Sequence, residues 1–277
     1  MANFLRDALL CCAFYLVANG ITVEQDMTLT NSQAKILEQF KSRLQDKLPH
    51  AYMRTDFYLI KWLLDSNYQL DLAEEKLLRN LKWRKDEGMD DGIHYEDWSD
   101  IWDEEARYSL DGRDKQGRPL LYVPIKHLDF RSLVISQRAE RFHRYVNKAM
   151  DEACSLVQEL YEKHGNISRG MAIFDLEGFN LVQHGCFRCL PHFIRMWTSF
   201  VDHWPKCVGD MFLINAPEPF VHLLNIAKPF SPKEILENLH VFGSNKNAWK
   251  AELRKYFDPE QLSTSLGGTK TYDWVEE

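Results

Sequence analysis

The chain has 277 residues, of which 45% are hydrophobic and 27% are charged, a composition typical of a globular protein with an ample core. The formal net charge of −7 argues against a nucleic-acid-binding protein, because such proteins carry a basic surface. The length predicts one large domain, or one domain with a small additional unit.

The first twenty residues contain an apolar run, Ala8–Ala18, which is too short to span a bilayer. Arg6 precedes the run, and Ala18-Asn19-Gly20 supplies the small residues of a cleavage site. Residues 1–20 therefore favour a signal peptide and a secreted protein, although Asp7 is unusual so near the start of one. The alternative is an N-terminal extension that packs on the body or touches a membrane, in a cytoplasmic protein.

Residues 30–90 predict a small all-helical module. Apolar residues recur at four-residue intervals from Ile36 to Leu48, which is the spacing of one face of a helix. The segment Phe57–Leu64 is nearly all apolar and predicts a buried helix. Asp71 is predicted to cap the next helix, which ends at Gly88.

After Leu110 the pattern changes to strands that alternate with helices, following a turn-rich loop at Asp111–Pro119. The predicted strands are Leu120–Val123, Met171–Phe174, Met211–Ile214 and Leu239–Phe242, and the predicted helices between them include Gln137–His164 and Cys186–His203. This order indicates an α/β fold with a mostly parallel sheet flanked by helices. A capping box, Ser231-Pro232-Lys233-Glu234, predicts a further helix with proline at its first position.

A short apolar helix is predicted between Pro219 and Pro229. Its apolar residues at helical spacing are Phe220, Leu223, Leu224 and Ala227. Prolines break helices on both sides, so the segment is bounded by two possible hinges. From periodicity alone it is either a packed core element or a lid that moves.

No motif in the chain predicts an enzyme. Asp175 and Glu177 follow a strand, and without a partner nucleophile they are interpreted as solvated acids in a turn. Cys186 and Cys189 form a C-x-x-C, but zinc would need a second ligand pair, so a redox role is the remaining alternative. The four cysteines after the leader are too few for a disulfide scaffold. We therefore expect no catalytic residue, no cofactor and no metal.

The sequence resembles the CRAL-TRIO lipid-binding domain family from about Thr30 to Trp274. The segments that carry the resemblance are Asp56–Lys85, Ala172–Phe179, Phe212–Phe230, Val241–Ser244, Asp258–Leu262 and Gly267–Thr269. Relatives include phosphatidylinositol, α-tocopherol and retinal transfer proteins. The resemblance implies a lipid-binding domain over 105–274, with a lid helix over an apolar pocket, preceded by the helical module.

By this resemblance, Pro219–Lys228 would be the lid, and the chain would bind one lipophilic ligand and transfer it between membranes without catalysis. The expected partners are a small hydrophobic ligand and, transiently, a membrane surface, and the expected state is a monomer. The expected ligand-binding residues are Phe142, Tyr145, Ala172, Phe174, Phe193, Trp197, Phe212, Ile214, Phe220, Leu223, Leu224 and Phe230.

Departures from the family bear on the ligand. Where phosphatidylinositol-binding members have Tyr-Pro-Glu, this chain has Trp204-Pro205-Lys206, and where they have a lysine after the lid it has Asn238. Gly170 and Ala172 stand where phosphatidylcholine-binding members offer hydroxyls. Because hydrogen bonds to charged headgroups contribute ~1.5–3 kcal/mol each, we expect a less polar ligand, such as a tocopherol, retinoid, carotenoid, sterol-like or fatty molecule.

Three alternatives remain open. The first is a phospholipid exchange protein whose headgroup is held by Lys206, Lys228 or Lys233. The second is a CRAL-TRIO interaction module without a ligand. The third is an oxidoreductase that uses Cys186 and Cys189.

Overall fold

The structure is a computed structural model that describes residues 21–103 and 105–271. The predicted signal peptide at 1–20 and the last residues of the predicted 105–274 domain lie outside the described residues. Within those two ranges, every helix is too short or too polar to cross a bilayer.

The N-terminal part is helical, as predicted. Its elements are α2 (Val23–Met27), α3 (Asn31–Leu44), η1 (Ala51–Arg54), α4 (Asp56–Asp65) and α5 (Leu70–Asp86). Thr30 caps α3, because its hydroxyl accepts a hydrogen bond from the Gln33 amide while the Gln33 side chain accepts one from the Thr30 amide. The predicted cap at Asp71 is wrong: α5 begins at Leu70, and Asp71 lies in its first turn, where a carboxylate favours the helix dipole.

A five-stranded sheet forms the centre of the larger part, with the strands in the order β1-β2-β3-β4-β5. The strands are β1 (Ser109–Arg113), β2 (Pro119–Pro124), β3 (Gly170–Asp175), β4 (Val208–Ile214) and β5 (Leu239–Val241). Only β1 runs antiparallel to its neighbour, so the predicted mostly parallel sheet is confirmed. The sequence did not predict β1, because its Asp111-Gly112-Arg113 resembles a turn. Gly112 is needed there, since a Cβ would lie 2.9 Å from a Leu120 methyl group.

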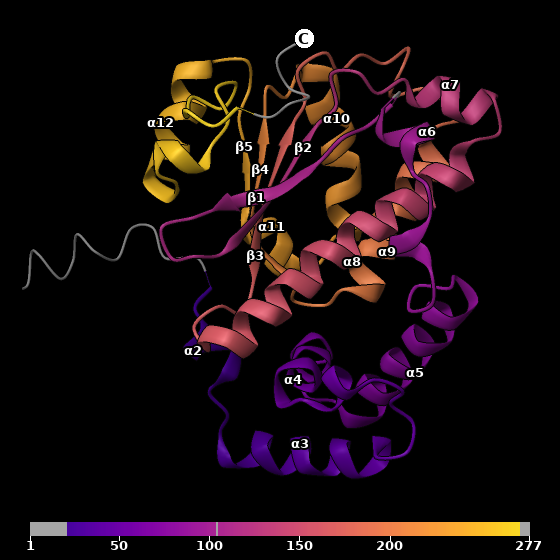
Figure 1. The fold of residues 1–277 in the computed structure, drawn as a ribbon, viewed down its shortest axis with the longest axis vertical. Helices are drawn as coiled ribbons and strands as arrows, with labels where there is room; N and C mark the ends of the chain where they lie inside the picture. Colours follow the sequence, from indigo (N-terminus) through magenta and orange to yellow (C-terminus); the bar gives the residue numbers. More distant parts are fainter. Residues whose placement is uncertain (1–20, 104, 272–277) are drawn as a thin grey trace, which may run out of the picture.

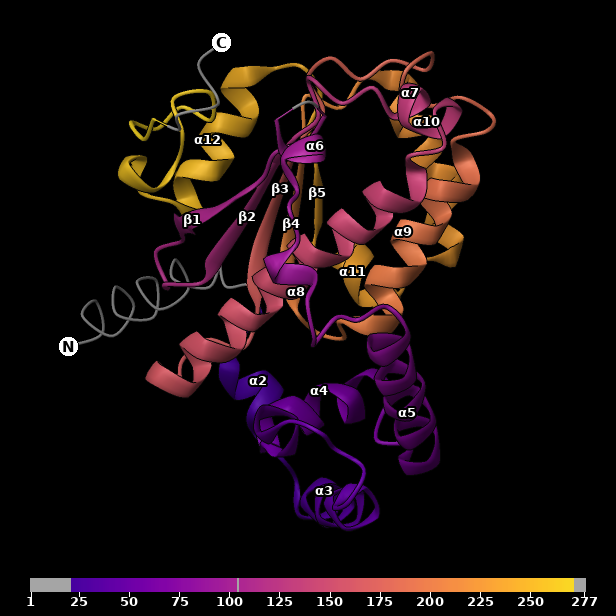
Figure 2. The ribbon, with the colours of Figure 1, turned by 45° about the vertical axis from the view of Figure 1, so that its right-hand side comes forward.

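Helices cover both faces of the sheet (Figures 1 and 2). Their bounds are η2 (Ile93–Tyr95), α6 (Ser99–Trp102), α7 (Phe130–Ile135), α8 (Ala139–His164), α9 (Leu190–His203), α10 (Glu218–Ala227), η3 (Lys228–Phe230), α11 (Lys233–Glu237), α12 (Lys246–Tyr256) and η4 (Pro259–Gln261). In both views α12 lies on one side of the sheet, and α8, α9 and α10 lie on the other. The predicted α/β class, with flanking helices and a helical lead-in, is confirmed.

Three predicted helix starts are wrong. The helix α8 begins at Ala139, because Gln137 adopts a left-handed φ of 63° that cannot continue a helix. The helix α9 begins at Leu190, after the two cysteines expected inside it. Pro232 is the cap residue of α11 rather than its first helical residue, and Glu234 forms no capping box because its side chain binds two cations instead.

A buried ion pair joins the helical part to α8. Nη1 of Arg84, on α5, donates a hydrogen bond of 2.7 Å to Oδ1 of Asp151, on α8. The Trp204 indole and the His94 ring also lie within 3.2 and 3.1 Å of this carboxylate. Burial alone would raise the pKa of Asp151, but hydrogen bonds from His94 and Arg84 outweigh it and lower the pKa to about 2. The carboxylate therefore stays ionised and fixes α5 against α8.

Replacing Asp151 with Asn should lower the free energy of unfolding by about 3 kcal/mol, because it leaves the buried Arg84 guanidinium with an incomplete partner. Urea unfolding measures this loss. The loss should shrink as the pH falls below ~4, since a carboxylate with a depressed pKa stabilises the fold only while it is ionised. The matched control is Asp86→Asn, which removes the exposed pair with Lys82 and should cost less than ~1 kcal/mol. Equal losses in the two variants would contradict a fixing role for Asp151.

Candidate functional site

The face of the sheet beneath α10 carries a continuous apolar surface. Because side chains alternate along a strand, Ala172 and Phe174 of β3 point to this face, and so do Met211 and Leu213 of β4. Strand register brings them together, since Ala172 pairs with Met211 and Phe174 with Leu213. We call this surface and the residues packed on it the lid-side cluster; its other members are Ile125, Leu176, Phe179, Phe200, Val208, Ala216, Phe220, Val221, Leu224 and Leu239.

The helix α10 packs on the lid-side cluster, but its own side chains are only partly buried there. Phe220, Val221 and Leu224 contact the cluster, and the Phe220 ring meets Phe179 edge-on at 5.3 Å between centroids. Among the described side chains of α10 none is fully buried, and Ile226 is 67% exposed. The predicted helix is thus confirmed, and neighbouring residues cover only part of the apolar surface of its side chains.

The helix α9 forms a second incompletely covered apolar wall. Phe193 packs against the hydrophobic core that α8 covers, and Phe200 contacts both this core and the lid-side cluster. The ring of Trp197 packs against that of Phe200, with 5.8 Å between the ring centroids. No described residue of α9 is fully buried, and Ile194 is 55% exposed. The Nε1 donor of Trp197 is shielded from water and has no hydrogen-bond partner among the described residues. Such an unpaired donor is costly unless another molecule accepts its hydrogen bond.

The structure gathers only part of the expected ligand-binding set. Ala172, Phe174, Phe220 and Leu224 belong to the lid-side cluster, and Leu223 is half-buried beside them on α10. Phe142 and Tyr145 lie in the core beneath α8 instead, with Phe130, and the Tyr145 hydroxyl donates to the carbonyl of Ala106. The side chain of Phe230 lies outside the described part of the chain.

For Phe212 and Ile214 the expected position beside the lid is wrong. Both point to the opposite face of the sheet, where they are fully buried beneath α12. The Phe212 ring stacks on His240 at 4.6 Å and meets Tyr256 edge-on. Residues 211–214 are all apolar, so the sequence did not distinguish the two faces of this strand. The alternation of side chains places Met211 and Leu213 in the lid-side cluster.

A buried polar network anchors the segment that leads into α10. Asn215 adopts a left-handed φ of 53° between β4 and α10. Its amide nitrogen donates to Asp175 at 2.7 Å, and its oxygen accepts from the Trp249 indole at 3.1 Å. Burial raises the pKa of Asp175, and the hydrogen bond from Asn215 partly offsets this effect. The interpretation of Asp175 as a solvated acid is therefore wrong: it is a structural carboxyl group, while Glu177 is exposed and pairs with Lys246.

The residues that depart from the family's headgroup pattern form an internal ion-pair network. The Lys206 ammonium binds Glu234 of α11, and Glu234 also binds Arg169, which is itself fixed by Asp26 at 2.7 Å. Burial would raise the pKa of Glu234, but Lys206 and Arg169 lower it. Asn238 donates to the backbone carbonyl of Glu234 at 2.8 Å. The sequence did not indicate this role of Glu234, because the pattern Ser231-Pro232-Lys233-Glu234 already assigned the residue to a capping box.

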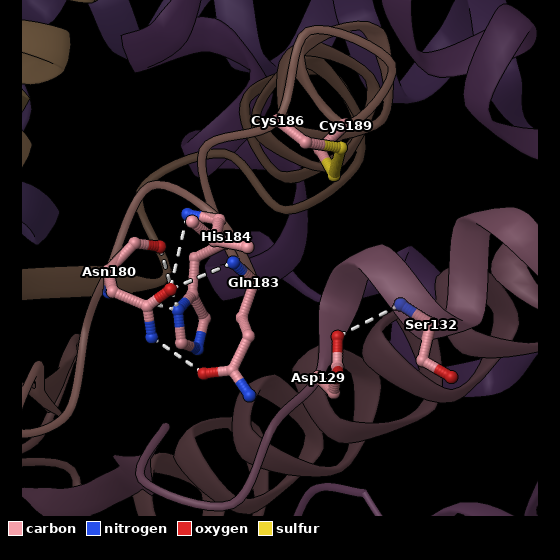
Figure 3. Close-up of a disulfide and its surroundings, with 8 residues drawn as sticks. Asp129, Ser132, Asn180, Gln183, His184, Cys186 and Cys189 are labelled. Carbon is pink, nitrogen blue, oxygen red and sulfur yellow. Dashed lines mark hydrogen bonds between the residues drawn. A yellow bond between two sulfur atoms is a disulfide. The ribbon is translucent and has the colours of Figure 1, made fainter.

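All four described cysteines are paired. One disulfide joins Cys154 of α8 to Cys207, just before β4, and the other closes Cys186 and Cys189. Figure 3 shows the second one at the start of α9, near the turn in which the Asn180 side chain binds the amides that follow it. The two sulfur atoms of the C-x-x-C are thus bonded to each other.

Comparisons with known proteins agree with this arrangement. Residues 104–268 match the protein-family model described as CRAL/TRIO domain. The chain is 26% identical to the Sec14 cytosolic factor of Schizosaccharomyces pombe over 252 residues, which cover 87% of this chain and 83% of that protein. It is 26% and 27% identical to the Arabidopsis thaliana phosphatidylinositol/phosphatidylcholine transfer proteins SFH9 and SFH12; these matches cover 76% and 86% of this chain but only 36% and 44% of those proteins. The crystal structure of Sfh5 has a TM-score of 0.65 at 12% identity, covering 88% of this chain and 89% of that one, which shows a shared fold.

Replacing Asn215 with Ala should lower the free energy of unfolding by about 3 kcal/mol, because it leaves the Trp249 donor unpaired and removes one of the two hydrogen bonds to the Asp175 carboxyl group, which keeps the one from the Glu177 amide. Alanine also adopts the left-handed conformation less readily than asparagine. Urea unfolding tests this, with Asn225→Ala on the exposed side of α10 as a control that should change little. Asn215→Gly adopts the left-handed conformation without strain, but it lacks the side chain that bonds to Asp175 and Trp249. If it unfolds like the wild type, the network does not stabilise the start of the lid.

Proposed function

The chain belongs to the CRAL/TRIO family, and we propose that it binds a single lipophilic ligand between the sheet, α9 and α10 and transfers it between membranes. The observation that carries the proposal is the incomplete burial of α10, a helix whose apolar side chains face the lid-side cluster while Ile226 remains exposed. A helix of this kind is costly in water and is stabilised by an apolar ligand or by a membrane surface.

The energetics suit a carrier. A lipid tail that buries ~400 Å² of apolar surface gains about 10 kcal/mol at ~25 cal/mol per Å². Association and ordering cost a comparable ~4–15 kcal/mol, so that the ligand is held and still released. Contact of α9 and α10 with a bilayer would favour an open state, because an open lid presents more apolar surface than a closed one.

We further propose that the ligand is less polar than a phosphoinositide. Lys206 and Glu234 satisfy one another, so an inositol phosphate headgroup would have to break a half-buried network that also includes Arg169. The unpaired indole donor of Trp197 suits a ligand with one hydroxyl or carbonyl group in an otherwise apolar body.

Phospholipid exchange is the second candidate, supported by the names of the two Arabidopsis thaliana relatives. In this case the headgroup would need cations outside the Lys206 network. Lys228 and Lys233 are exposed at the end of α10 and the start of α11, where a headgroup at the mouth of the site could reach them.

Replacing Phe220 or Leu224 with Ser should slow ligand transfer between liposomes about tenfold. Each change removes ~1.5–3 kcal/mol of apolar burial from the contact with ligand or bilayer, and 1.4 kcal/mol corresponds to a factor of ten. His222→Ser is the matched control on the exposed side of the same helix and should leave the rate unchanged. Transfer at the wild-type rate by both apolar variants, with unaltered unfolding midpoints, would contradict a lid role for α10.

Native mass spectrometry of protein purified from its own tissue, followed by organic extraction, should detect one low-polarity lipophile per chain. A stoichiometric phosphatidylinositol or phosphatidylcholine would overturn the less polar ligand and favour exchange. In that event Lys228→Ala and Lys233→Ala should slow phospholipid transfer. A chain that is empty in every gentle preparation would contradict carriage altogether.

A further inference from the structure

Away from the lid-side cluster, three potential metal ligands converge where α8 meets α9. Glu140 and His143 are three residues apart on α8 and therefore share one face of that helix, and His192 faces them from the first turn of α9. One ligand atom from each of the three side chains lies within 4.8 Å of the others. The imidazole rings of His143 and His192 are 5.0 Å apart between centroids.

His143 is the unusual member of this group. Only 4% of its surface is exposed, yet neither ring nitrogen has a hydrogen-bond partner among the described residues. The nearest carboxylate oxygen, on Glu140, is 4.0 Å from Nδ1, beyond hydrogen-bonding distance. Buried polar groups are almost always satisfied, so an imidazole with two unpaired nitrogens indicates a missing partner. A Leu or Phe at this position would fill the same space without the cost of an unpaired polar group.

We propose that Glu140, His143 and His192 bind a divalent zinc ion. Two imidazoles and one carboxylate form a ligand set that zinc accepts, and a fourth position would remain for water or an exogenous ligand. The Glu-x-x-His spacing on one helix, completed from a facing helix, is also a metal-binding arrangement in helical bundles. Zinc here would tie α9 to α8 and so fix the wall that α9 contributes beside the lid.

The geometry requires a small contraction. Two ligands of a tetrahedral zinc, each ~2.0–2.1 Å from the metal, lie about 3.3 Å apart, so the widest pair must close by ~1.5 Å. Glu140 can supply this movement, because its side chain is 67% exposed. It must share or release Arg195, which is half-exposed, and exposed ion pairs of this kind contribute little.

The surrounding charges do not oppose a cation. Glu140 and His143 line a cleft of ≈ 370 Å³ whose lining also includes three arginines and Glu87. Each arginine is already paired with a carboxylate: Arg141 with Glu96 and Asp100, Arg144 with Glu96, and Arg195 with Glu140. Arg141 and Arg144 are therefore neutralised without Glu140, and Arg195 would share Glu140 with the metal. Glu87 adds a negative charge to the lining.

Isothermal titration of the full chain with Zn²⁺ tests the proposal, with no affinity tag and with both disulfides intact so that tag histidines and thiols do not compete. We expect one zinc ion per chain. Glu140→Gln and His192→Ala should each raise the Kd at least tenfold, and both residues are accessible enough for the variants to fold. His222→Ala removes an exposed histidine on α10 and should leave the Kd unchanged.

Titration with Co²⁺ gives a second readout, the visible absorption of the bound metal. This absorption would not appear if Glu140, His143 and His192 had only a structural role. Binding at three protein ligands should produce the visible absorption of a low-symmetry cobalt site, and the band should disappear in His192→Ala. Zinc binding that is absent, or that has the same Kd in Glu140→Gln, His192→Ala and the wild type, would overturn the proposal. Because neither titration measures lipid binding or transfer, this outcome is independent of ligand carriage.

Discussion

The alternation of side chains along β2, β3 and β4 decides which residues pack under α12 and which pack under α10, and the other contacts follow from this division. On one face, Tyr122, Ile173 and Phe212 are fully buried against residues of α12. On the other face, Ala172 and Leu213 are covered by helices whose own side chains remain half-exposed. A shift of one residue in any strand would exchange the two faces, so the register of the sheet decides which residues face α12 and which face α9 and α10, where the ligand is proposed to bind.

The helix α10 differs from ordinary core in how it is held. It begins at Glu218, three residues after Asn215, which is tied into a buried network with Asp175 and Trp249. Prolines disfavour extension of the helix in either direction. The start of the helix is thus anchored, while its apolar face is only partly packed. Movement of such an element breaks few apolar contacts, which is consistent with the carrier proposed above.

Charge is used inside this protein mainly to join elements that are far apart in sequence. Arg84 and Asp151 connect α5 to α8, and Glu234 connects α11 to Lys206 and Arg169. These pairs occupy cations that could otherwise hold a phosphate. The ligand preference proposed for the site follows from the same pairs that stabilise the fold, which is why it could not be judged from the presence of lysines alone.

The sequence by itself determined the α/β class, the helical lead-in and the existence of the helix between Pro219 and Pro229, because these depend on local periodicity and on proline. It could not determine which residues of 211–214 face α10, nor that Glu234 binds Lys206 rather than capping a helix, nor that Asp175 is buried and accepts a hydrogen bond from Asn215. It also did not bring His143 of α8 to His192 of α9, since 48 residues of unrelated pattern separate them. These features depend on which strands pair and which helices pack together. Local periodicity does not report such contacts, because they form between segments that are far apart in the sequence.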